Sequence, residues 1–328
     1  GCAAVLRHYC IMPAQGKLFI TNNLEDSKLG KILKYICITG CGFMLSVASV
    51  MADEVLMPFV LASTSSGEVA SVTSEVKPKL TASGFEIVGE YSPYDGAHIV
   101  VVTSDSMKAY AAKSNFGAYG AIARVSITRN GDVTEVTYTN PEYTAAAYRM
   151  AVDMADIRAQ LEGALGAEKD FGSEKKLTAE KLRKYHYKFA MPYFDDQSEL
   201  AKYASQAEAV KAIEDALAAG KGATAKVYRV DIPGKDETIF GVALKGKDGE
   251  DCSADQYIMG KIDNSSPRHT AHLPYEIVVS DGVPHALSAK FRIAINWPHL
   301  SMMGEGSFMS IMCAPDAIEK ALVKASGK

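Results

Sequence analysis

Hydrophobic and polar positions follow the same order twice along the chain. An apolar segment at 56–63 precedes residues 67–83, whose apolar side chains recur every three to four positions. This spacing is typical of an amphipathic helix that follows a strand. The second half repeats the arrangement, with an apolar segment at 190–197 and a helical pattern at 205–219.

Two β-hairpins are predicted after each of these helices. In the first half, runs rich in β-branched residues flank Asp95-Gly96 and Asn130-Gly131, which are turn-forming pairs. In the second half, the corresponding turns are expected at Pro233-Gly234 and within 282–285. The predicted last strands are 133–140 and 286–296; each leads through a proline corner into a long terminal helix, and these helices are predicted at 144–165 and 307–325.

The order strand, helix, four strands, helix therefore occurs twice. We predict an α+β fold of two tandem β-α-β4-α units, each an antiparallel sheet with helices on one face, arranged as a pseudo-dimer. Pairing the units would protect sheet edges, which otherwise favour aggregation. The predicted boundaries are 53–165 for the first unit, 166–184 for a charged linker, and 185–328 for the second, divergent unit.

The first 52 residues have a different character. Basic residues from Lys28 onward precede an apolar run at 35–52 that ends in Val50-Met51-Ala52, the pattern of a secretory signal peptide. We predict a signal peptide at 28–52, cleavage between Ala52 and Asp53, and a periplasmic or secreted protein. The run is also long enough to act as an uncleaved anchor. Residues 1–27 are interpreted as upstream translation that does not belong to the native protein.

The first unit resembles a known family. Its segment "GFEIVGEY" at 84–91 and its exit "TNPEYTAAAYRM" at 139–150 are similar to the domain-of-unknown-function 302 family, over about residues 57–165. The resemblance implies an antiparallel sheet with helices on one face, of the TATA-binding-protein-like type. It implies no activity. The second half matches in the order of its elements alone.

Composition narrows the functional classes. The net charge of −4 disfavours nucleic-acid binding, which usually requires a basic surface. No further membrane-spanning run follows the signal peptide. Outside the first 52 residues the cysteines are Cys252 and Cys313, which could form one disulfide in an exported protein. Two separate buried thiols are the simpler prediction.

A methionine-rich stretch, "INWPHLSMMGEGSFMSIMC" at 295–313, raises the question of a metal. Thioethers and imidazoles suit Cu(I), so His299, Met302 and Met303 are candidate ligands, with His269 and His272 as further ones. Core packing is the competing explanation. Aligning the two terminal helices assigns Met309 and Cys313 to the core.

The two proline corners suggest a ligand cleft. Aromatic-lined clefts between elements are common small-molecule sites. The candidates here are Asn140, Tyr143 and Tyr148 in the first unit, and Asn296 and Trp297 in the second. Alternatively, Asn140 caps a helix, and the corner is structural.

No serine lies in a nucleophile-elbow motif, which argues against a hydrolase. We therefore predict an exported, non-catalytic protein that binds a small or apolar ligand, or a partner protein, at a sheet–helix cleft or between the units. The alternative is a periplasmic copper- or haem-handling protein. The expected state is a monomer with an internal pseudo-dimer, or a homo-oligomer.

Overall fold

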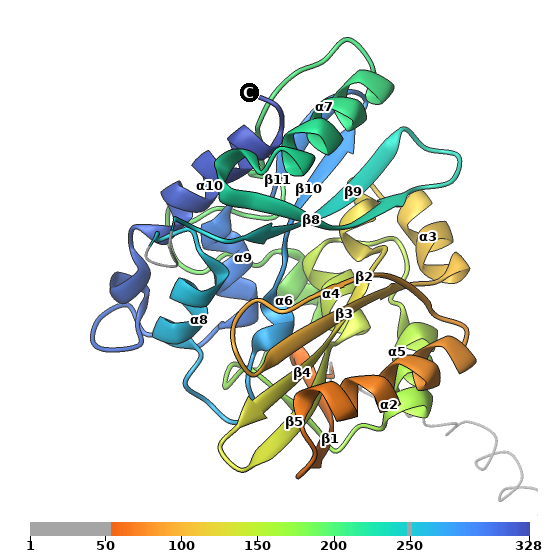
Figure 1. Cartoon of the computed structure of the whole chain (residues 1–328), viewed down its shortest axis with the longest axis vertical. Helices are drawn as coiled ribbons and strands as arrows, with labels where there is room; N and C mark the ends of the chain where they lie inside the picture. Colours follow the sequence, from red (N-terminus) through yellow and green to blue (C-terminus); the bar gives the residue numbers. More distant parts are fainter. Residues whose placement is uncertain (1–53, 248–250) are drawn as a thin grey trace, which may run out of the picture. The chain divides into compact units, whose positions relative to one another are not determined.

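The computed structural model describes residues 54–247 and 251–328, and its two antiparallel sheets confirm the predicted α+β class (Figure 1). The predicted signal peptide, its cleavage site and the segment 1–27 lie outside the described residues. Residues 53–328 form one compact unit. In the described part of the chain, no helix is both long and apolar enough to cross a membrane.

The first sheet has six strands in the order β2-β3-β4-β5-β1-β6. These are β1 (Phe59–Ser65), β2 (Glu86–Tyr91), β3 (Ala97–Thr103), β4 (Ala123–Asn130), β5 (Val133–Thr139) and β6 (Lys169–Phe171). The short β6 lies inside the segment predicted as a linker, and it pairs with β1. The segment 166–184 is therefore partly built into the sheet.

The second sheet has five strands in the order β7-β11-β10-β9-β8. These are β7 (Ser198–Glu199), β8 (Thr224–Asp231), β9 (Glu237–Leu244), β10 (Tyr275–Ser280) and β11 (Val283–Ala286). The predicted strand at 190–197 is wrong, because this segment is irregular and the two-residue β7 follows it. Pro192 and the adjacent Asp195 and Asp196 disfavour a strand there.

The helices pack on and between these sheets. They are α2 (Val69–Ala82), α3 (Asp105–Ala112), α4 (Pro141–Ala147), α5 (Ala155–Leu165), α6 (Ala179–Arg183), α7 (Gln206–Ala218), α8 (Asp255–Ile262), α9 (Ala289–Asn296) and α10 (Ala314–Ala325). Short 3₁₀ segments are η1 (Gly117–Gly120), η2 (Lys221–Ala223), η3 (Thr270–His272) and η4 (Phe308–Ile311). The helices α2 and α7 match the prediction closely. The helices α3 and α8 fall between the hairpins of each half, where none was predicted.

The predicted last strand at 286–296 is wrong, because most of it is helix α9. Every residue of α9 except Lys290 is buried. Its polar residues Arg292 and Asn296 are also buried, so the sequence lacks the continuous polar face that identifies a surface helix. Such a run resembles a buried strand.

The two predicted terminal helices are each interrupted. In the first half α4 and α5 are separated by a turn, in which Arg149 and Met154 have positive φ angles. This turn brings the side chains of Met150 and Met154 into the core. In the second half the helix begins only at Ala314, followed by Pro315, which is favoured in the first turn of a helix.

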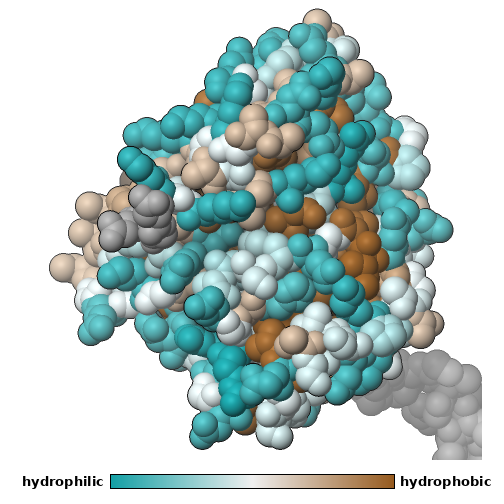
Figure 2. Space-filling model, viewed as in Figure 1, coloured by the Kyte–Doolittle hydropathy of each residue, from teal (hydrophilic) through white to brown (hydrophobic). Residues whose placement is uncertain are grey.

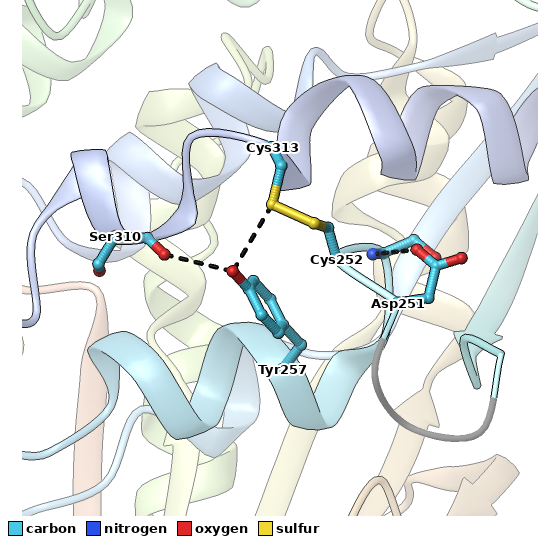
Figure 3. The surroundings of a disulfide bond; sticks show 6 residues. Asp251, Cys252, Tyr257, Ser310 and Cys313 are labelled. Carbon is cyan, nitrogen blue, oxygen red and sulfur yellow. Dashed lines mark hydrogen bonds between the residues drawn. A yellow bond between two sulfur atoms is a disulfide. The ribbon is translucent and has the colours of Figure 1, made fainter.

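The assignment of Met309 and Cys313 to the core is also wrong. Met309 is about half exposed, and Cys313 forms a disulfide with Cys252. The disulfide joins the start of α10 to the segment before α8, and the Tyr257 hydroxyl points toward the Cys313 sulfur (Figure 3). The prediction of two separate thiols failed because the cysteines lie 61 positions apart in the sequence, and sequence alone did not show that they meet.

The core continues from one sheet to the other. On the outer face of the first sheet, α2 and α5 cover a cluster that includes Val76, Val102 and Leu161. On its other face, Ile99 and Val101 belong to a larger cluster that extends through the second sheet. Protein side chains therefore cover the inner face. The surface view is mainly hydrophilic, with hydrophobic residues gathered in the middle (Figure 2).

Five of the six strands of the first sheet correspond in order to the five strands of the second, and β6 has no counterpart there. The order β2-β3-β4-β5-β1 in the first matches β8-β9-β10-β11-β7 in the second. Both edge strands, β2 and β8, carry a one-residue bulge, at Val88 and Val227. The bulges lie against each other: a Cβ atom at Gly89 would lie 2.1 Å from the Val227 carbonyl oxygen. Only glycine permits this approach.

The residue that follows each bulge can be traced through its paired residues on the next two strands, and the two sheets give equivalent series. The corresponding positions, in order, are Gly89, Val101 and Arg124 in the first sheet, and Tyr228, Gly241 and Glu276 in the second. Arg124 and Glu276 therefore occupy the same position in their respective sheets. They also bind each other, and both are buried.

Candidate functional site

The first hairpin of each half reaches the other half. At the turn 92–96, between β2 and β3, the Tyr94 hydroxyl lies 2.8 Å from the Thr270 hydroxyl. At the turn 232–236, between β8 and β9, Lys235 donates to the Ser114 carbonyl. Both contacts are made to the segment that follows the middle helix of the opposite half. We call the first contact region the open corner and the second the closed corner.

A cleft of about 190 Å³ lies at the open corner. One wall comes from the β2–β3 turn, and the other from α8 and the loop after it. The lining residues are Tyr94, Asp95, Gln256, Met259, Gly260, Asp263 and Arg268. The cleft is thus built from both halves of the chain.

Asp263 is the most deeply buried charged group that lines this cleft, with a side chain 1% exposed. Its Oδ1 atom accepts the His269 backbone N–H at 2.9 Å and lies 3.3 Å from His269 Nδ1. Its Oδ2 atom has no hydrogen-bond partner among the described residues, and the same holds for Arg268 Nε. Buried polar atoms are nearly always bonded, so these two atoms are exceptions, and both are closed off from solvent within the wall of the cleft.

The ionisable side chains around Asp263 at the cleft are those of Arg268, Tyr94 and Asp95. Arg268 Nη1 bonds the backbone carbonyl of Asp263, not its carboxylate. Burial, helped by the charge of Asp263, raises the pKa of Tyr94, so its phenol keeps its proton at neutral pH. Asp95 is exposed at the edge of the cleft.

His269, His299 and Trp297, three of the residues singled out from sequence, meet behind Asp263. The His269 ring lies 5.0 Å from the Trp297 ring and 6.4 Å from the His299 ring, measured between centroids. His269 Nε2 and Trp297 Nε1 are both buried without a hydrogen-bond partner in the described part of the chain. The His299 residue is exposed, but partial desolvation of its ring and the nearby His269 lower its pKa, which favours its neutral, metal-binding form.

His272 is committed to a different network. Its Nδ1 atom lies 3.3 Å from Arg292 Nη1, which can only donate. The Nε2 atom must then carry the proton, and it donates to the Tyr275 hydroxyl at 3.0 Å. Burial and the nearby arginines lower the pKa of His272 far below its usual value. Both ring nitrogens are occupied within the protein.

The predicted metal ligands are therefore only partly brought together. His269 and His299 are neighbours, whereas Met303 is largely exposed and Met302 is partly buried, in the loop before η4. Across residues 54–247 and 251–328, no three His, Cys, Asp or Glu side chains are grouped to hold a metal ion. A copper site would need Met302 to join the two imidazoles.

The candidates for a cleft in the first half are all buried, and Asn140 and Tyr143 are hydrogen-bonded through their side chains. Asn140 accepts the Glu142 N–H as the N-cap of α4 and donates to the Met57 carbonyl. Tyr143 donates to the Ile295 carbonyl at 2.7 Å, which ties α4 to α9. Tyr148 stacks on Phe194 at 5.5 Å.

The candidates in the second half behave similarly. Asn296 lies at the end of α9, where its amide donates to the Arg292 carbonyl. Trp297 is 2% exposed, and the cavity beside it has a volume of only about 10 Å³. Asn140 and Asn296 are not equivalent, because Ser288 is the residue at the N-cap of α9. The predicted correspondence of the two proline corners is wrong for this reason.

A serine, a histidine and a glutamate are linked at the β2–β3 hairpin. His98 lies 3.0 Å from the Ser92 hydroxyl and 3.3 Å from Glu90. The corresponding Asp231 and Thr238 of the β8–β9 hairpin also share a hydrogen bond, at 2.8 Å. Because the second hairpin has the same link without a histidine, this network fits hairpin stabilisation.

Sequence reasoning missed Asp263 and Arg268. The sequence analysis of the loop between α8 and η3, residues 263–269, considers only His269. It is longer than the corresponding segment 113–116 between α3 and η1, and the extra length shapes the cleft. Once the two helices are known, comparing these lengths would reveal the difference.

No family model, no curated protein and no solved structure matches this chain. The similarity of residues 57–165 to the domain-of-unknown-function 302 family stays a prediction.

Proposed function

We propose that the protein is an exported, non-catalytic binding protein made of two related α+β units, with a small-molecule site in the cleft between them. The observation that carries this proposal is the buried Asp263 carboxylate, which lines the cleft with one oxygen unpaired. An unpartnered buried carboxylate oxygen is costly unless another group satisfies it. A polar molecule that enters the cleft and reaches Oδ2 would supply that group.

The pseudo-dimer part of the proposal is supported by the sheets. Both have the same strand order, and both edge strands carry a bulge at the same register position. Each first hairpin contacts the segment after the middle helix of the opposite half, although through different groups. In a twofold arrangement, residues near the axis meet their own equivalents, and Arg124 meets Glu276.

Export is supported by the disulfide. The bond between Cys252 and Cys313 belongs to an oxidising compartment such as the periplasm or the extracellular space. It also secures the start of α8, which forms one wall of the cleft. An oxidising compartment would therefore help to keep α8, and with it the wall of the cleft, in place.

The experiment is a thermal-shift screen of small polar molecules with the purified protein. A ligand of the folded state raises the unfolding midpoint by mass action. We expect hits whose effect disappears in Asp263→Asn and persists in Asp215→Asn, an exposed carboxylate on α7. Hits that are unaffected by Asp263→Asn, or a screen without hits, would overturn the proposal.

Copper handling is the second candidate, because His269 Nε2 is unpartnered and the His299 ring lies 6.4 Å from the His269 ring. A Cu(I) titration with a competing chelator tests it. We expect one copper per chain that is lost in both His299→Ala and Met302→Ala. Equal copper affinity in these variants and the native chain would exclude this site.

A further inference from the structure

Three methionines are exposed together on the surface of the second half. Methionine is usually a buried residue, and Met107 and Met150 are each 1% exposed. In contrast, Met303, Met309 and Met312 are 78%, 49% and 60% exposed. Every other methionine in residues 54–247 and 251–328 is at least partly buried. The exposed three are thus confined to one short segment, 303–312, which contains η4.

Backbone hydrogen bonds hold this segment in a defined conformation. The Phe308 N–H donates to the Ser301 carbonyl at 2.9 Å. The Met309 N–H donates to the Met302 carbonyl at 3.2 Å, and the Met312 N–H donates to the Met309 carbonyl at 3.4 Å. Side chains three positions apart in a 3₁₀ turn lie one above the other. Met309 and Met312 therefore lie on the same side of η4.

Two contacts with α8 and the segment before it secure η4. The Tyr257 hydroxyl donates to the Ser310 carbonyl at 3.4 Å, and Cys313 is joined to Cys252 (Figure 3). Because this bond uses both cysteines of residues 54–247 and 251–328, that part of the chain has no free thiol. Thiolates are otherwise the preferred targets of oxidants. The exposed thioethers are therefore the sulfur atoms most open to oxidation there.

We propose that Met303, Met309 and Met312 form an oxidation site, which takes up peroxides before the rest of the protein is damaged. One oxygen atom passes from hydrogen peroxide to the methionine sulfur: the O–O bond breaks, an S=O bond forms and water leaves. The sulfur is oxidised by two electrons, and the peroxide is reduced by two. Sulfoxide reductases return methionine sulfoxide to methionine, so the modification is reversible.

Oxidation is tolerated at these positions and harmful at buried ones. A sulfoxide is polar, and on an exposed side chain it stays in water, where changes have little effect on stability. Met107 belongs to the core of the first half, and Met259, which lines the cleft, is 3% exposed. A sulfoxide at either place would bury a polar group without a hydrogen-bond partner. Uptake at the exposed methionines therefore spares the core and the cleft.

Limiting hydrogen peroxide, followed by peptide mapping with mass spectrometry, tests this inference on residues 53–328, which form one compact unit. We expect the first three molar equivalents of oxygen at Met303, Met309 and Met312, with an unchanged thermal unfolding midpoint. Sulfoxide at Met107 or Met259 should appear only at higher doses. Oxygen that is spread evenly over all methionines, or that appears first at the buried ones, would overturn the inference.

A triple variant tests whether the site protects the protein. Leucine has a similar volume but cannot accept oxygen, so Met303→Leu, Met309→Leu and Met312→Leu together remove the site. After three equivalents of peroxide have reacted, the triple variant should carry sulfoxide at Met259 and have a lowered unfolding midpoint, unlike the native chain. Met107→Leu is the control and should keep the native order of uptake. An equal change of midpoint in the native chain and the triple variant would contradict the protective role.

Discussion

Arg124 and Glu276 occupy equivalent register positions in the two sheets and bind each other in the interior. Glu276 also accepts from Arg292 Nε at 3.1 Å. In an exact twofold arrangement, equal residues would face each other at this place, and equal charges would repel. Because one half has an arginine at this position and the other a glutamate, the two side chains attract each other. Two identical halves could not form this ion pair.

Glu276→Gln should therefore be strongly destabilising, because it leaves two buried arginines without a carboxylate. Breaking a buried ion pair costs about 3–5 kcal/mol. Arg124→Met should cost less, because Arg292 continues to pair with Glu276. Urea unfolding of both variants measures the difference, and a smaller loss for Glu276→Gln than for Arg124→Met would contradict this description.

The contact between β2 and β8 depends on Gly89. A methyl group there would overlap the Val227 carbonyl, so Gly89→Ala should cost about 1–3 kcal/mol. Gly163→Ala, in α5, is the control, because a Cβ atom at that site meets nothing within 4 Å. The control should be neutral or slightly stabilising. Similar unfolding free energies for the two variants would argue against the close crossing of the strands.

Asp255 should make stability depend on pH. It is buried at the start of α8, where it accepts from Tyr91 and the Leu244 N–H, and burial raises its pKa to about 7. In the unfolded chain, its pKa lies near 3.9. Between these values the folded state keeps a proton that the unfolded state has lost, so the free energy of unfolding falls as pH rises from about 4 to about 7.

The corresponding test compares Asp255→Asn with the native chain at pH 4 and pH 8. As the pH rises from 4 to 8, the free energy of unfolding of the variant should increase by on the order of 4 kcal/mol relative to that of the native chain. Denaturant unfolding at both pH values measures this difference. A difference that does not change with pH would show that Asp255 is ionised in the folded protein as it is in the unfolded chain.

The disulfide should stabilise the protein and the cleft together. Replacing Cys252 and Cys313 by serine should lower the free energy of unfolding by about 2–4 kcal/mol. Because the bond secures α8, which forms one wall of the cleft, ligand binding in the cleft should also weaken. Reductant should have the same effect on the native chain and none on the double variant. Unfolding of the native chain that is insensitive to reductant would argue against the bond.

Some of the fold was predictable because its signals are local. The turns at Asn130-Gly131 and Asp95-Gly96 and the periodic apolar residues of α2 and α7 indicated most strands and the first helix of each half. Helix α9 was not predictable in this way, because its burial on most sides removes the polar face. The two-residue β7 is too short to produce a pattern at all.

The candidate site was less predictable, for a physical reason. The sequence predicts His269 and His299 as candidate metal ligands, and the fold brings their rings together next to Asp263. The cleft itself depends on the approach of the β2–β3 turn to α8, which are separated by more than 150 residues. No local sequence pattern around Asp263 indicates that the β2–β3 turn lies next to it.

Nuclear magnetic resonance of the labelled protein, titrated with the strongest hit of the thermal-shift screen, locates the binding site residue by residue. We predict amide shift changes concentrated in the β2–β3 turn at 94–96, in α8 and in the loop 263–269, with the largest effects near Asp263 and Gly260. We also predict that these changes disappear in Asp263→Asn and persist in the control variant Asp215→Asn. Shift changes centred elsewhere in the chain would contradict a binding site in this cleft.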